Sequence, residues 1–130
     1  MKKTFFLASL LACILSACES KLVEQVQLIP QAENVEILNG SLAMSKLQTI
    51  QSPEAWKATA ENFISDVQKT AELSLALATE SASIVLTENT NLPKEAYNLS
   101  ITKSGVQIEA SDVPGISHGL TSLHQLILTA

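Results

Sequence analysis

Two alternating segments near the end of the chain limit its fold more than any other feature. In the ranges 97–102 and 106–111, apolar residues take every second position and polar residues take the positions between them. Successive side chains point to opposite faces of a strand, so each range predicts a strand with one apolar face. A turn at Ser104-Gly105 would join these strands and set Ile101 opposite Ile108. The sequence therefore predicts an antiparallel sheet with one face open to water.

Two other segments have the period of an amphipathic helix. The range 53–72 starts after Ser52, and its apolar residues recur at spacings of three and four. The last segment starts at Asp112, a favourable N-cap residue, with Pro114 in its first turn. The apolar stripe of this last helix comprises Ile116, Leu120, Leu123 and Ile127. Each helix therefore has one apolar stripe that can pack on the sheet.

The last helix is apolar on more than one side, because Leu126 and Leu128 lie off its stripe. A sheet can cover only one side of a helix. We therefore expect a second apolar surface, which includes Leu120, Leu126 and Leu128, to lie exposed and available to a partner.

Further strands are predicted from β-branched and turn residues. The range 81–88 is apolar and β-branched, and 47–52 can supply a short strand. Asn39-Gly40 lies between apolar runs, which predicts a hairpin with strands at 35–38 and 42–44. The period of the region between the helix and the strand at 81–88 fits either a helix tail or a strand.

The first residues are predicted to be a signal peptide that is absent from the mature protein. Lys2 and Lys3 precede an apolar run over 5–15, which is typical of a secretory signal peptide. Leu15, Ser16, Ala17 and Cys18 resemble the lipobox of bacterial lipoproteins, which implies lipid attachment at Cys18. A plain secretory signal and an uncleaved anchor are the alternatives. The domain plan is then a signal peptide at 1–17, a tether at 18–27 and one α+β domain at 28–130.

Lipidation would place the protein on a membrane of the bacterial cell envelope, since more than one acyl chain gives stable anchoring. Glu19 favours the outer membrane, because it does not resemble the aspartate that signals retention at the inner one. Cys13 would leave with the signal and Cys18 would carry lipid, so no structural disulfide is expected.

Charge argues against a nucleic-acid partner. The chain has 13 acidic residues and 8 lysines, with no arginine, and loss of Lys2 and Lys3 leaves a net charge of about −7. Binding to phosphate backbones relies on clustered Arg and Lys.

Two stretches resemble a known family. The runs "LIPQAENVEILNGSLAMSK" (28–46) and "EAYNLSITKSGVQIEASDVPGISHGLTSLHQL" (95–126), with the helix between them, are similar to the accessory N-terminal domain of bacterial β-N-acetylhexosaminidases of glycoside hydrolase family 20. The departures are Gln31-Ala32 in place of a second proline and Ser122 where the family often has Thr. The resemblance implies an antiparallel sheet with two roughly parallel helices on one face, packed between that sheet and a catalytic (β/α)₈ barrel.

The family's chemistry uses an adjacent Asp-Glu pair in the barrel, with the Glu as general acid and the Asp orienting the acetamido group of the substrate. The chain contains no Asp-Glu or Glu-Asp dipeptide, so no catalytic residue is assigned and the chain alone is expected to be inactive. No cofactor is expected. No metal site is expected either, because His118 and His124 are six residues apart and fail the spacing of a helical metal pair.

Two functions are compatible with the sequence. The first is a non-catalytic domain of a lipid-anchored β-N-acetylhexosaminidase, acting on N-acetylglucosamine-containing glycans such as chitin oligomers only through the missing barrel. Leu120, Leu126 and Leu128 would then face that barrel. The alternative is a stand-alone surface lipoprotein that binds a glycan or a protein partner.

Overall fold

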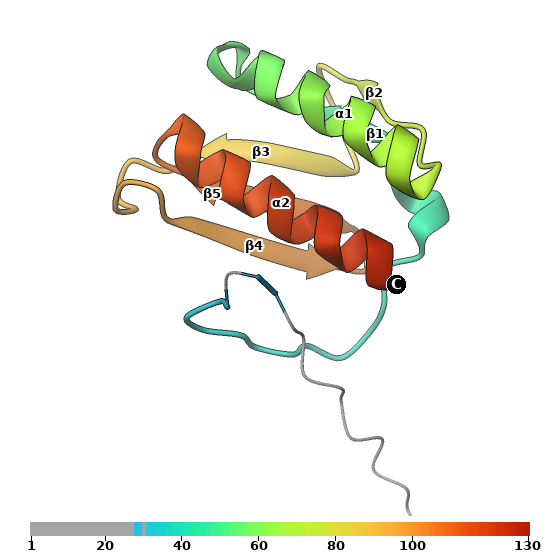
Figure 1. The fold of residues 1–130 in the computed structure, drawn as a ribbon, viewed down its shortest axis with the longest axis horizontal. Helices are drawn as coiled ribbons and strands as arrows, with labels where there is room; N and C mark the ends of the chain where they lie inside the picture. The colour runs from blue at the N-terminus through green and yellow to red at the C-terminus, as the bar shows by residue number, and fades with distance from the viewer. Residues whose placement is uncertain (1–27, 30) are drawn as a thin grey trace, which may run out of the picture.

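The computed structural model describes residues 28–29 and 31–130. The predicted signal peptide, Cys18 and the tether lie outside the described residues. The elements in chain order are η1 (Met44–Lys46), β1 (Thr49–Gln51), η2 (Glu54–Trp56), α1 (Lys57–Ala71), β2 (Ala76–Leu77), β3 (Ile84–Glu88), β4 (Tyr97–Thr102), β5 (Gly105–Ala110) and α2 (Val113–Thr129). They form a sheet with α1 and α2 lying side by side over one of its faces (Figure 1).

Most of the predicted elements form. The two predicted helices correspond to η2 with α1 and to α2, and the predicted strand at 81–88 corresponds to β3. The region between α1 and β3, which fitted helix or strand, contains the two-residue strand β2. The mixed α and β architecture with two helices on one face is therefore confirmed, while the other face of the sheet stays uncovered by any described element (Figure 1).

The predicted antiparallel pairing is wrong for most of the sheet. The strand order is β2-β1-β3-β5-β4, and only the β4–β5 pair is antiparallel. The reason is the connections: α1 crosses over the sheet between β1 and β2, and the loop over 78–83 leads from β2 to β3, so that both β2 and β3 run parallel to β1. Likewise, β4 carries the chain back between β3 and β5.

The β4–β5 hairpin has a different register from the predicted one. Its turn lies at Lys103-Ser104, so Leu99, rather than Ile101, lies opposite Ile108. The shift is two residues, so the apolar faces still coincide. Gly105 opens β5 with φ +154°, and a Cβ there would lie 2.6 Å from the Ser83 carbonyl oxygen. Gly105 pairs with Thr102 and is therefore the first residue of the strand, and the close approach of Ser83 leaves no room for a side chain there.

The hairpin predicted around Asn39-Gly40 is absent, since the range 31–43 contains no strand. A two-stranded hairpin is marginally stable unless a third strand or a helix supports it, and no described strand pairs with this segment. The segment passes below β4 in Figure 1, with Val35, Ile37 and Leu38 exposed. It is tied down near its start, where the Gln125 side-chain amide forms two hydrogen bonds with the backbone of Ile29.

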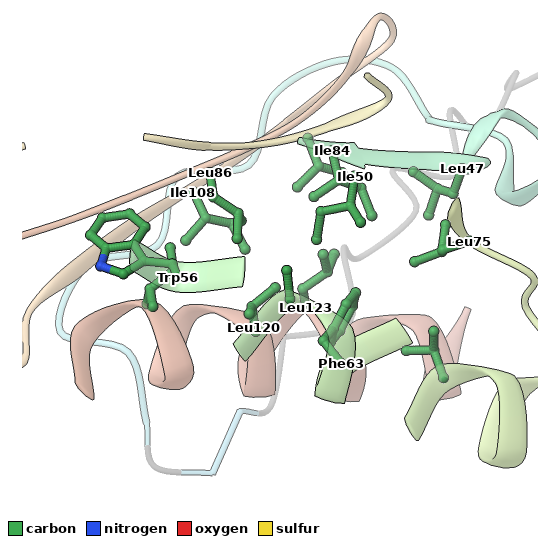
Figure 2. Packing of buried hydrophobic residues seen from close by; sticks show 14 of the residues in the cluster. Leu47, Ile50, Trp56, Phe63, Leu75, Ile84, Leu86, Ile108, Leu120 and Leu123 are labelled. Carbon is green, nitrogen blue, oxygen red and sulfur yellow. The ribbon is translucent and has the colours of Figure 1, made fainter. Parts of the chain in front are cut away.

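The core lies between the sheet and the helices. Figure 2 shows Ile50, Ile84 and Ile108 of the sheet directed toward Phe63 and Leu123 of the helices. All four residues of the predicted α2 stripe are buried, namely Ile116, Leu120, Leu123 and Ile127. The periodicity of the sequence therefore placed the core-facing sides of both helices correctly.

Candidate functional site

The three leucines predicted to form an exposed surface of α2 differ in position. Leu120 is only 3% exposed, so its predicted exposure is wrong. It is buried because α2 is covered on two sides, by the sheet beneath it and by α1 beside it (Figures 1 and 2). Leu126 is half-buried, on the side of the buried Ser122 and Leu123. Leu128 is 54% exposed, so of these three leucines it alone is fully on the surface.

The outer side of the helical layer has a groove of about 230 Å³ between α1 and α2. Both helices line it with residues at the spacing i, i+3, i+4, i+7, which places the four residues of each set along one side of a helix. The lining residues are Thr59, Asn62, Phe63 and Asp66 of α1 and Ser117, Leu120, Thr121 and His124 of α2. Phe63 and Leu120 are buried, so they form an apolar floor beneath polar walls. Leu128 continues the α2 side of the groove by one turn.

A short chain of hydrogen bonds joins the two helices at one end of the groove. The Thr70 hydroxyl donates to the backbone oxygen of Asp66 at 2.7 Å, and it lies 2.7 Å from His124 Nε2. The hydroxyl has one proton, so Nε2 of His124 donates to Thr70 in one tautomer of the ring and accepts from it in the other. The His124 ring also meets the ring of Phe63 edge-on, with centroids 6.3 Å apart.

The hydroxyls of α2 along the groove donate hydrogen bonds to backbone carbonyl groups of the same helix. Ser117 donates to the Val113 carbonyl and Thr121 donates to the Ser117 carbonyl, each at 2.9 Å. These bonds consume both protons, so the two oxygens can only accept further hydrogen bonds. A carboxylate is likewise an acceptor only, and no described residue donates to the side chain of Asp66.

The open face of the sheet carries a second depression, of about 350 Å³, near the β4–β5 turn. Its lining is mostly hydroxyl and amide groups, such as Ser100, Thr102 and Gln107, and none of the lining residues is aromatic. The Ser83 hydroxyl at its edge is already bonded to Thr49 and to the Gln48 amide, where it bridges β1 and β3. This face lacks an apolar platform on which a sugar ring could stack.

The two histidines lie apart. His118 is exposed and His124 lines the groove, and the described part of the chain holds no group of three His, Cys, Asp or Glu side chains placed to bind a metal. Among helices within residues 28–130, none is long and apolar enough to span a membrane.

The groove between α1 and α2 was not predicted from the sequence, because short polar residues such as those that line it are ordinary on the surface of either helix alone. The signal that could have found it is the matched spacing of polar residues beside both apolar stripes.

Comparisons with known proteins agree on one family. The model of glycosyl hydrolase family 20, domain 2, matches residues 25–130. Among solved structures, an exo-β-N-acetylglucosaminidase of this family from Vibrio harveyi, in complex with N-acetylglucosamine, is similar with a TM-score of 0.69 and 21% identity, over 78% of this chain and 16% of that chain. A β-N-acetylhexosaminidase from Bacteroides fragilis is similar with a TM-score of 0.63 and 21% identity, over 77% of this chain and 21% of that one.

At this identity the structural likeness shows a shared fold. The chain matches only a small part of the length of either enzyme, 16% of one and 21% of the other. A search of curated protein sequences finds no match.

Proposed function

Because the chain belongs to glycosyl hydrolase family 20, domain 2, we propose that it is the non-catalytic accessory domain of a β-N-acetylhexosaminidase. The observation that carries this proposal is the extent of the family match, which covers 25–130 and so includes every helix and strand described. The domain supports a catalytic (β/α)₈ barrel rather than performing the reaction itself.

The outer side of α1 and α2 is the surface that meets the barrel. It carries a groove with an apolar floor, and the exposed Leu128 extends it toward the end of α2. The opposite, sheet side of the molecule is a polar surface without aromatic residues in its depression. A protein interface needs an apolar centre with a polar rim, and the helical side is the one that supplies both.

Hydrolysis belongs to the barrel in this account. The family's reaction needs an Asp-Glu pair, and the chain has no such dipeptide. The complete enzyme acts on N-acetylglucosamine-containing glycans such as chitin oligomers. Lipid attachment at Cys18 holds it at the bacterial cell envelope, on the outer membrane, with 18–27 as the tether.

Joining the full chain to a family 20 barrel tests the interface. We expect the barrel in the fusion to melt at a higher temperature than the bare barrel, because it gains a packed surface. Leu128→Asp should remove this gain, since it places a charge in the interface. Ser100→Asp, on the open face of the sheet, is the matched control and should leave the gain intact. Equal melting of bare and fused barrels would refute the proposed role.

A simple assay tests the division of labour. The full chain without a barrel should not hydrolyse an aryl N-acetylglucosaminide above the rate in buffer. Turnover that persists after further purification would show that the chain is itself an enzyme. Binding of a chitin oligomer to the full chain alone, with no stabilisation of any barrel, would instead favour a stand-alone binding lipoprotein.

A further inference from the structure

The Asn39-Gly40 pair lies in an exposed part of the chain. The sequence predicts a tight turn there, but both residues belong to the irregular segment 31–43, and both are exposed. Among the described residues, none forms a hydrogen bond with the Asn39 side chain or with the Gly40 amide. The backbone nitrogen of Gly40 and the carboxamide of Asn39 are therefore free to approach each other.

Glycine removes the usual obstacle to a reaction between these two groups. A backbone nitrogen can attack the carboxamide carbon of the preceding asparagine, but the side chain of its own residue normally shields it. Gly40 has no side chain, and its φ of +124° lies in a region that other residues rarely adopt. The pair thus combines an unshielded nucleophile with an exposed carboxamide.

We propose that Asn39 is a site of spontaneous deamidation. The Gly40 nitrogen forms a bond to Cγ of Asn39, and the proton of this nitrogen leaves with the side-chain amino group as ammonia. A cyclic imide, the succinimide, remains. Water then opens the ring: its hydroxyl adds to one ring carbonyl carbon and its other proton goes to the ring nitrogen. Opening at one carbonyl gives aspartate, and opening at the other gives isoaspartate, whose main chain runs through Cβ.

The other asparagines do not meet both conditions. Each is followed by a residue with a bulky or branched side chain, namely Asn34, Asn62, Asn89, Asn91 and Asn98. Asn62 and Asn98 also lie within α1 and β4. The amide that follows Asn91 donates to the Asn89 carbonyl at 3.1 Å, so this nitrogen is already in use. Asn34 is the best internal control, because it is exposed in the same segment as Asn39 but precedes Val35.

Deamidation changes the charge beside the β4–β5 turn. The Lys103 side chain lies against Gly40, since a Cβ built on this glycine would lie 3.2 Å from Cγ of Lys103. The new carboxylate makes the net charge of −5 more negative by one, and it arises one residue from this contact with a cation. Opposite charges attract at such short range, so aspartate at position 39 favours the contact between the segment and the turn. The inference is independent of the function proposed above.

Peptide mass spectrometry of the folded chain tests the proposal. The full chain is incubated in buffers of rising pH and digested with trypsin, whose cuts after Lys21 and Lys46 place Asn34 and Asn39 in one peptide. We expect Asn39 to convert to a mixture of isoaspartate and aspartate, faster at higher pH, while Asn34 stays intact. Gly40→Ala should slow the conversion, because a methyl group then shields the attacking nitrogen. Val35→Gly should make Asn34 reactive as well, because it gives Asn34 the same neighbour.

Three results would overturn the inference. The first is a stable Asn39 in the folded chain under conditions in which a synthetic peptide of residues 34–46 converts, since the fold would then protect the site. The second is equal conversion of Asn34 and Asn39 in the unaltered chain, which would remove the role of Gly40. The third is conversion to aspartate without isoaspartate, which would exclude the succinimide.

Discussion

Leu120→Ala distinguishes the core position shown by the structure from the exposed position expected from sequence. The side chain is 3% exposed, and in Figure 2 it lies below Ile108 in the layer between sheet and helices. Buried Leu→Ala changes cost about 2.7–5 kcal/mol, with the larger values for sites that leave a closed cavity. Leu120 also borders the groove, which is open to solvent, so part of the vacated space becomes accessible to water. We therefore expect a loss near the lower end of that range, about 2–3 kcal/mol.

The assay is unfolding of the full chain followed by circular dichroism, in urea and on heating. For a domain of this size, about 1 kcal/mol corresponds to a shift of roughly 4 °C or more, so Leu120→Ala should melt at least about 8 °C lower. Leu128→Ala is the matched control: it removes the same atoms from a residue that is 54% exposed, and should change stability by less than about 0.5 kcal/mol. Equal effects of the two substitutions would refute the burial argument.

Three further substitutions test contacts of α2. Gly119→Ala would place a Cβ 2.5 Å from Cγ2 of Ile108, so it should destabilise the fold by about 1–3 kcal/mol in urea unfolding; an unchanged midpoint would show that the helix can move away at little cost. Asp112→Ala removes the N-cap that accepts from the Gly115 amide at 2.9 Å, and should cost about 1–2 kcal/mol in the same measurement. Gln125→Ala breaks both hydrogen bonds to the first described segment, so proteolysis there should accelerate while the melting temperature stays nearly constant; unchanged cleavage would show that the bonds do not restrain it.

The sequence pattern correctly predicted the features that depend on a single helix or strand. The spacing of its apolar residues predicted the buried side of the first helix, and of the six predicted residues four are buried and two are partly buried against the same core, namely Trp56, Ala60, Phe63 and Val67, and Ile64 and Ala71. Asp112 was predicted to cap the last helix because of its residue type, and it accepts the Gly115 amide as expected. The alternation of 97–102 and 106–111 identified the two strands, since a period of two fixes which residues share a face.

The sequence pattern failed to predict the features that depend on contacts between two or more helices or strands. Alternation carries no information on strand direction, and the parallel pairs follow from the connections between strands, such as the α1 crossover from β1 to β2. Asn39-Gly40 has the residues for a tight turn, but no described strand supports its flanks. Leu120 was expected to be exposed because the sheet alone was counted as cover, whereas α1 lies against the other side of α2. The groove is a product of the same helix pair.

We propose that this domain works as part of a β-N-acetylhexosaminidase. The most direct measurement is to sequence the gene through and beyond the codon for Ala130. We predict an open reading frame that continues into a (β/α)₈ barrel with an adjacent Asp-Glu pair. A stop codon after Ala130 with no barrel encoded in the same gene would contradict it.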